Sequence, residues 1–326
     1  MKRFKNILCI IEETQTSQNI LERAVKLAKD NQAKLTVASV IVNSKTSFNI
    51  FKKILNINNI ETLLQNEKRK ELENLTEPFA DQLEIQIKIF FGTPFYEIIY
   101  NVLQNNYDLV MKAPQNADWM HRLFGSNDMH LLRKCPCPIW FIKPDAPHSF
   151  DNIMAAVDVN IDTQTEETES KVQEELNHQI LQMASSLAVS ELATLHILHV
   201  WDAPETALMQ GAFIKMPDSE VIEYVENIHN LHNSKLKALL QDAARTQVGE
   251  MLEFLEPDIH LVRGLPSKVI PQYIKKLQID LIVMGTVART GLAGVIMGNT
   301  AEDILNQIDC SVLAIKPPGF KTPISL

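Results

Sequence analysis

Apolar and polar residues follow the same order twice along the chain. The segment Ile20 to Ile41 aligns without a gap onto Ile180 to Trp201, and eight of the 22 positions are identical. In each copy apolar residues recur at spacings of three and four and then run into a continuous apolar stretch. The first pattern predicts a helix that covers a sheet, and the second predicts a buried strand. Each half therefore contains the same helix and strand in the same order.

The correspondence continues on both sides of this segment. It covers apolar runs at 7–11 and 153–157, Gly-x-Pro turns at 92–94 and 264–266, apolar runs at 109–111 and 281–284, and final runs at 137–144 and 310–317. Continuous apolar strands alternating with amphipathic helices predict an α/β fold with two tandem, doubly wound, parallel five-stranded sheets of the Rossmann type. We place the domains at 1–145 and 150–317, with the boundary in 143–150 and a loose tail after Pro317.

The most distinctive loop follows the fourth predicted strand of the second half. Four of the ten glycines of the chain lie between Met284 and Ala301. Glycines let backbone N–H groups approach a phosphate, and a helix N-terminus adds unpaired donors. Asn299 or Thr300 is predicted to cap the next helix, with Glu302 or Asp303 completing a capping box. Ligands of doubly wound sheets bind at the carboxyl ends of the strands, which is where this loop begins.

Composition narrows the classes of partner. The chain is 45% hydrophobic and 22% charged, with a formal net charge of −9. This charge argues against nucleic acid and anionic membranes as partners. The sequence contains neither a signal-type apolar segment nor an apolar run long enough to span a bilayer, so we expect a cytoplasmic protein. The four cysteines are interpreted as small core residues.

Other polar groups are interpreted as structural. Cys135 and Cys137 flank a proline, and because no second ligand pair follows them we do not predict zinc. His196 and His199 are expected on opposite faces of a strand, whereas His229 and His232 share a helix face that we expect at the surface. The acidic segment 158–175 is longer than its counterpart, and we interpret it as a solvated loop, with a lid as the alternative. No pattern of catalytic residues is present.

The second half resembles the universal stress protein family, whose nucleotide-binding members carry a G-x2-G-x9-G-[S/T] motif. Gly285, Ala288, Gly298 and Asn299 stand at those spacings, so two of the four positions match. The similarity extends to the strand ending at Asp158, to His199-Val200 and to the final strand of each half. Two such domains in one chain resemble the tandem E-type subgroup.

The resemblance implies an adenine nucleotide alpha hydrolase-like fold and a stress-response protein that binds ATP, with Mg²⁺ when ATP is bound. By position, Asp158 would lie beside adenine or ribose and Val200 would meet adenine. The phosphates would be surrounded by Gly285, Ala288, Gly298, Asn299 and Thr300. Ala156 stands where many ATP-binding members have proline. Any hydrolysis would be slow and incidental.

The first half lacks these features. Its two possible registers place the first pair of motif glycines on Lys112 and Gln115 or on Ala113 and Asn116, and Glu12 replaces the aspartate. We therefore expect a scaffold that binds no nucleotide.

The family resemblance also implies that the last strands, within 138–143 and 311–316, pair the halves as an intramolecular pseudo-dimer, and further homodimerisation is compatible with it. Three alternatives remain open: an adaptor with both sites inactive, a binder of another phosphorylated or lipid-like metabolite, and a weak ATPase.

Overall fold

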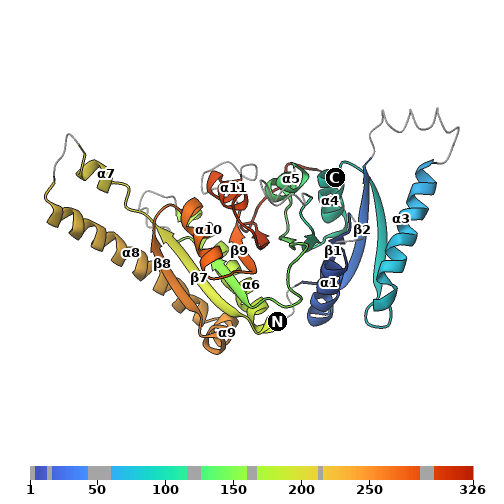
Figure 1. Ribbon diagram of the computed structural model, residues 1–326, viewed down its shortest axis with the longest axis horizontal. Helices are drawn as coiled ribbons and strands as arrows, with labels where there is room; N and C mark the ends of the chain where they lie inside the picture. Colours follow the sequence, from blue (N-terminus) through green and yellow to red (C-terminus); the bar gives the residue numbers. More distant parts are fainter. Residues whose placement is uncertain are drawn as a thin grey trace.

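The computed structural model describes residues 4–12, 17–42, 60–115, 126–159, 167–211, 216–286 and 297–325. Strands and helices alternate along each half (Figure 1). The first half contains β1 (Asn6–Ile10), α1 (Ser17–Asn31), β2 (Lys34–Val42), α3 (Ile60–Thr76), β3 (Ile85–Gly92), α4 (Pro94–Asn105), β4 (Leu109–Lys112), α5 (Ser126–Lys134) and β5 (Ile139–Phe141). The second contains β6 (Asn152–Ala156), α6 (Glu167–Glu191), β7 (Thr194–Trp201), α7 (Thr206–Met209), α8 (Asp218–Ala244), α9 (Gln247–Leu255), β8 (Asp258–Arg263), α10 (Pro266–Lys276), β9 (Leu281–Gly285), α11 (Asn299–Leu305) and β10 (Ser311–Ile315).

All these strands belong to one sheet, in the order β3-β2-β1-β4-β5-β10-β9-β6-β7-β8. Within each half, neighbouring strands are parallel, as the sequence predicts. The two halves meet at β5 and β10, which pair antiparallel with Trp140 opposite Leu313. The two predicted five-stranded sheets are thus joined edge to edge, and we call the β5/β10 contact the seam.

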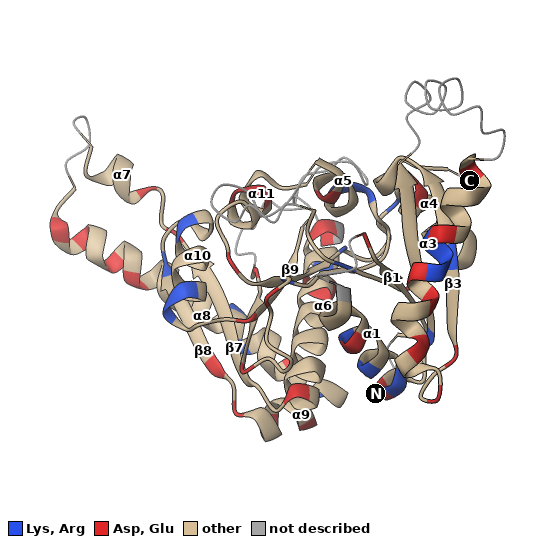
Figure 2. Cartoon of the chain, turned by 45° about the vertical axis from the view of Figure 1, so that its right-hand side comes forward, with Lys and Arg blue, Asp and Glu red and all other residues tan. Residues whose placement is uncertain are grey.

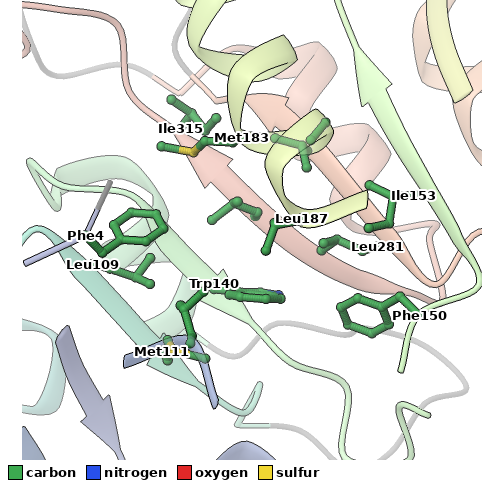
Figure 3. Close-up of a cluster of buried hydrophobic side chains, with 14 of the residues drawn as sticks. Phe4, Leu109, Met111, Trp140, Phe150, Ile153, Met183, Leu187, Leu281 and Ile315 are labelled. Carbon is green, nitrogen blue, oxygen red and sulfur yellow. The ribbon is translucent and has the colours of Figure 1, made fainter. Parts of the chain in front are cut away.

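The core forms two layers, one on each face of the sheet. Successive strand residues point to opposite faces, so that Trp140 belongs to one buried cluster and Phe141 to the other. Both clusters contain residues of both halves, and Figure 3 shows Trp140 between Met111 of the first half and Leu187 of the second. Packing across the seam therefore makes the two halves one structural unit.

The two predicted Gly-x-Pro turns have the same backbone geometry. Gly92 has φ of 146° and Gly264 has φ of 147°. Each is followed by an extended residue and then by the proline that begins α4 or α10. Proline suits a first helical position because it needs no N–H donor there, and glycine suits a positive φ because it has no Cβ. This repeated turn sets the entry of a helix at the end of β3 and of β8.

An arginine holds the segment that links the halves. Arg23 of α1 is buried, pairs with Glu191 of α6 at 3.2 Å, and donates to the carbonyl oxygens of Pro147 and His148. Its guanidinium carbon lies 3.7 Å from the centre of the Phe150 ring. The predicted boundary at 143–150 is therefore an anchored linker.

Two expectations about irregular segments were wrong. The acidic segment is helical from Glu167 onward, where it forms the start of α6, and acidic residues in a first helical turn favour this conformation. The tail after Pro317 is not loose along its whole length, because Ile324 packs against the second core cluster.

Helix α8 covers the sheet with only one of its ends. Most of its buried residues, among them Leu236, Leu239 and Ala243, lie toward the C-terminus, whereas its N-terminal part, which includes the buried Val221, extends beyond the sheet (Figure 1). Acidic side chains, among them the exposed Glu220, Glu223 and Glu226, follow that projecting part (Figure 2).

Candidate functional site

The candidate site lies where the order of the strands reverses in the second half. From β6 the chain crosses to β7 on one side, while β9 pairs with β6 on the other. Ala156 is opposite Leu198 of β7 and Met284 of β9, so that Asp158, Val200 and Gly285 lie near the same edge. A switch point of this kind is where open α/β sheets bind their ligands.

Asn177 of α6 fixes the backbone at Asp158. Its side-chain amide donates to the Asp158 carbonyl oxygen at 2.9 Å, and its side-chain oxygen accepts the Asp158 N–H at 3.0 Å. Asn177 is 3% exposed, so these bonds are shielded from water. Sequence reasoning missed this residue because its partner lies 19 positions away across an insertion. The clamp holds the strand end from which the Asp158 side chain projects.

Gly285 has a structural reason to be a glycine. A Cβ atom at this position would lie 2.8 Å from Cδ2 of Leu176 in α6, closer than carbon atoms approach in proteins. The missing side chain therefore lets α6 pack directly on the end of β9. This packing favours a glycine here independently of any ligand, so Gly285 alone does not identify a phosphate site.

The third motif glycine lies directly before α11. The Gly298 N–H donates to the Thr286 carbonyl oxygen at 3.3 Å, which brings the start of α11 beside the end of β9. Gly298 itself is the N-cap residue and Asn299 is the first helical residue, so the expected capping by Asn299 or Thr300 was wrong. The amides of the first turn have no acceptor within the helix. Ala288 lies outside the described residues.

Val200, Asn299 and Thr300 differ in exposure. The side chain of Val200 is buried in the second core cluster, while Asn299 and Thr300 are exposed at the start of α11. The structure thus brings Ala156, Asp158, Gly285 and Gly298 to one edge, with Asn299 and Thr300 facing solvent there.

Contacts from the first half reach this edge across the seam. The Lys316 ammonium, at the end of β10, donates to the Leu132 carbonyl oxygen of α5 and to Thr286 Oγ1 at 2.8 Å. Burial lowers the pKa of Lys316 to about 8. Arg133 of α5 pairs with Glu302 of α11 at 2.7 Å, and the two helices lie side by side (Figure 1).

The equivalent edge of the first half is closed by an internal ion pair. Ile10 of β1 and Ala156 of β6 occupy the same position in the two aligned halves. Lys112 is opposite Ile10 and Met284 is opposite Ala156, so Lys112 and Met284 are equivalent. Lys112 Nζ lies 2.5 Å from Oδ1 of Asp128 and 3.1 Å from Oε1 of Glu12. Both Lys112 and Asp128 are fully buried. This register selects Ala113, rather than Lys112, as the counterpart of Gly285.

Asp128 also holds the loop that follows β4. Its Oδ2 accepts the Gln115 N–H at 2.7 Å. Residue 128 corresponds to Ala301 in α11, because Leu131 and Leu132 occupy the core positions of Ile304 and Leu305. In the second half this pair of positions holds the apolar side chains of Met284 and Ala301. The first half thus places its own carboxylate and ammonium beneath the loop.

Histidines form two pairs on opposite faces of β7. His196 contacts His260 with ring nitrogens 3.3 Å apart, and His199 Nε2 lies 2.9 Å from His232 Nδ1. The opposite orientation of His196 and His199 agrees with the prediction. The surface position predicted for His232 was wrong, because this side chain is 7% exposed.

The described ranges hold neither a metal-binding cluster nor a membrane-spanning helix. There, no three His, Cys, Asp or Glu side chains are arranged to hold a metal ion. None of the described helices combines the length and apolarity needed to cross a bilayer.

Comparison with known proteins gives a consistent match over the whole chain. The model of the universal stress protein family matches residues 3–143 and 172–316. Universal stress protein E of Salmonella typhi is 30% identical over 100% of this chain and 98% of its own length. The protein of the same name from Escherichia coli K12 is 28% identical over the same shares of both chains.

Solved structures show the same fold. A putative universal stress protein from Pseudomonas aeruginosa has a TM-score of 0.68 at 23% identity, covering 97% of this chain and 94% of that one. A universal stress protein from Archaeoglobus fulgidus has a TM-score of 0.57 at 18% identity, covering 95% and 98%. These similarities concern the arrangement of the backbone.

Proposed function

The chain belongs to the universal stress protein family and carries two such domains in tandem, and from this premise we propose that its second half binds ATP or a related phosphate-bearing ligand. We further propose that it acts as a cytoplasmic stress-response protein. All four cysteines are reduced and buried, which is typical of proteins from a reducing compartment.

One observation carries the proposal. The helix start at Gly298 is bonded to Thr286 and lies beside the switch point formed by β6 and β9. An anion at this place would meet the N–H groups of a first helical turn and the positive end of the helix dipole. Asn299 and Thr300 are exposed there, and their side chains would contact the phosphates.

The base and ribose would lie toward β7. Asp158, held by Asn177, would accept hydrogen bonds from the ribose or adenine, and the backbone near Val200 would border the base. Ala156 would lie beneath them, and Ala288 would lie in the loop that covers the phosphates. Mg²⁺ would enter with the nucleotide, bound to the phosphates. We assign no catalytic residue, so any hydrolysis would be slow.

We propose that the first half serves as a scaffold. The Lys112 ammonium already has two carboxylate partners, and Asp128 already accepts the N–H of the loop. A nucleotide phosphate would have to displace the buried Asp128 carboxylate. The Lys112 ammonium and the Gln115 N–H would then lose their partner and would need a new one.

The experiment has two parts. The purified full chain is denatured, and any released small molecule is identified by mass spectrometry. The refolded or ligand-free chain is then titrated with ATP and Mg²⁺ by calorimetry. We expect one ATP per chain. Gly298→Asp, which puts a carboxylate at the start of α11, should abolish the signal, and the matched change Gly125→Asp in the first half should leave it unchanged.

Three outcomes would contradict the proposal. If no nucleotide is released and no heat is measured on titration, ATP binding is excluded and an adaptor is favoured. Release of another phosphorylated molecule would identify the ligand within the proposed class, whereas release of a lipid-like molecule without a phosphate would contradict that class. Loss of binding in Gly125→Asp, with Gly298→Asp unaffected, would move the site to the first half.

A further inference from the structure

Two thiols meet where α5 joins β5. The Cys135 N–H still donates to the Leu131 carbonyl oxygen, Pro136 follows, and Cys137 comes two residues before the strand. The two Sγ atoms are 3.6 Å apart. A disulfide needs a separation of about 2.05 Å, so a shift of about 1.5 Å would join them.

A lysine from the other half lies against this pair. The antiparallel register of β5 and β10 places Phe141, Trp140 and Ile139 opposite Val312, Leu313 and Ala314. Continued by two residues, it brings Lys316 opposite Cys137. The Lys316 ammonium is bonded to the carbonyl oxygen of Leu132, three residues before Cys135. A buried positive charge therefore lies next to the thiols.

This charge and the contact between the thiols distinguish the two sulfurs. Burial alone would raise the pKa of Cys135, but the hydrogen bond from Cys137 and the charge of Lys316 outweigh burial and lower it. The same hydrogen bond, together with burial, raises the pKa of Cys137 well above its usual value. Because the Lys316 charge acts on Cys135, we take Cys135 as the sulfur that attacks an oxidant and Cys137 as the one that resolves it.

We propose that Cys135 and Cys137 are a redox modification site that hydrogen peroxide converts into a reversible disulfide. The Cys135 thiolate attacks one peroxide oxygen, the O–O bond breaks, and hydroxide leaves, giving a sulfenic acid. The Cys137 sulfur then attacks the Cys135 sulfur, the S–O bond breaks, and the departing hydroxide takes the Cys137 proton. In total, two thiols and one peroxide give one disulfide and two waters, and two electrons pass from sulfur to oxygen.

The size of the oxidant follows from burial. Cys135 is 0% exposed and Cys137 is 8% exposed, so only a small oxidant reaches the pair without unfolding. Among the described residues, which include all four cysteines, these are the two thiols in contact. Burial raises the pKa of Cys9 to about 12 and also raises that of Cys310, which makes both unreactive.

The test uses the full chain, reduced and then freed of reductant. Hydrogen peroxide is added, the reaction is stopped, and free thiols are counted after denaturation. We expect two of the four thiols to disappear together. Mass spectrometry should find the loss of two hydrogens on the peptide with Cys135 and Cys137, and dithiothreitol should restore both thiols. In Cys137→Ser, the sulfenic acid on Cys135 should persist and should be trapped by dimedone that is added together with the denaturant.

Two lysine variants separate the effect of Lys316 from general effects of charge. Removal of the ammonium in Lys316→Met should slow the oxidation severalfold, because the charge that lowers the pKa of Cys135 is lost. Lys143 takes the matching place opposite Cys310, so Lys143→Met is the control and should oxidise at the wild-type rate. If Lys316→Met does not fold, the cysteine variants and the mass measurement still decide.

Two results would overturn the proposal. The first is that Cys135 and Cys137 stay reduced in excess peroxide while the chain remains folded, which would mean that the pair does not react. The second is that all four thiols are lost at one rate, which would mean that oxidation follows unfolding.

Discussion

Lys112 Nζ and Asp128 Oδ1 lie 2.5 Å apart in the core of the first half, where the second half has Met284 and Ala301. The same two buried positions thus hold an ion pair in the first half and apolar side chains in the second. Apolar packing avoids the loss of hydration that two buried charges suffer.

This difference predicts a non-additive pair of substitutions. Among the described residues, Asp128→Ala leaves the Lys112 ammonium with Glu12 as its carboxylate partner, and we expect the free energy of unfolding to fall by about 3 kcal/mol. The double variant Lys112→Met, Asp128→Ala copies the second half and should recover most of that loss. Urea denaturation measures both. A double variant no more stable than Asp128→Ala would contradict the equivalence of the two sites.

The clamp on the linker predicts a contrast between two cations that share one carboxylate. Arg23→Ala leaves Glu191 buried and frees two linker carbonyl oxygens, so we expect a loss of about 3 kcal/mol. Lys26 contacts the same Glu191 oxygen at 3.0 Å, but its side chain is 47% exposed. Lys26→Ala should therefore cost less than about 1 kcal/mol. Equal losses in urea denaturation would show that burial of Arg23 does not set the effect.

A third prediction separates packing from ligand binding at Gly285. Gly285→Ala places a Cβ against Leu176 and should destabilise the protein by about 1–3 kcal/mol. Leu176→Ala makes room, so the double variant should be more stable than the two single losses predict. Unfolding of all three variants by urea gives the coupling energy. Zero coupling would mean that the glycine does not serve this contact.

ATP titration of the same double variant addresses the ligand. Normal affinity would assign Gly285 to packing alone, whereas lost affinity in a folded double variant would assign it also to the ligand.

The pKa of Lys316 predicts a dependence of stability on pH. The pKa is lowered from 10.5 to about 8 in the folded chain, so the unfolded chain binds more protons between about pH 8 and 10.5. The contribution of Lys316 to the free energy of unfolding should therefore rise with pH across this window. The raised pKa of Cys9 acts in the opposite sense at alkaline pH.

The difference between wild type and Lys316→Met removes the contribution of Cys9, which is common to both proteins. Guanidinium denaturation at several pH values should show the wild type gaining stability relative to the variant as pH rises from 8. A difference that stays constant would mean that the ammonium is not desolvated.

The repeated fold was predictable from the sequence because its determinants are local. Apolar strands, helical spacing and the two Gly-x-Pro turns are visible in each half and confirm one another. The start of α6 was missed because acidic residues were interpreted as a solvated loop, although the same residues stabilise a first helical turn.

The details of the site depend on distant contacts and were less predictable. Nothing near Gly285 in the sequence indicates that Leu176 packs on it, and His232 is buried against His199 and Trp201, which lie on a distant strand. Lys112 and Asp128 are 16 residues apart, and their pairing follows from the position of α5 over β4. Motif spacing pointed to one edge of the sheet, but it did not indicate the side chains that support this edge.

The antiparallel seam has a consequence for how this protein responds to dilution. Two separate chains joined at such an edge would dissociate as their concentration fell, by mass action. Here residues 144–151 tether the partners, so the pairing of β5 with β10 is unimolecular and independent of the number of molecules in the cell. A tethered pair is also freed from symmetry, since a substitution in one partner is not copied into the other. One half can therefore accumulate buried charges while its neighbour keeps apolar side chains at the equivalent positions.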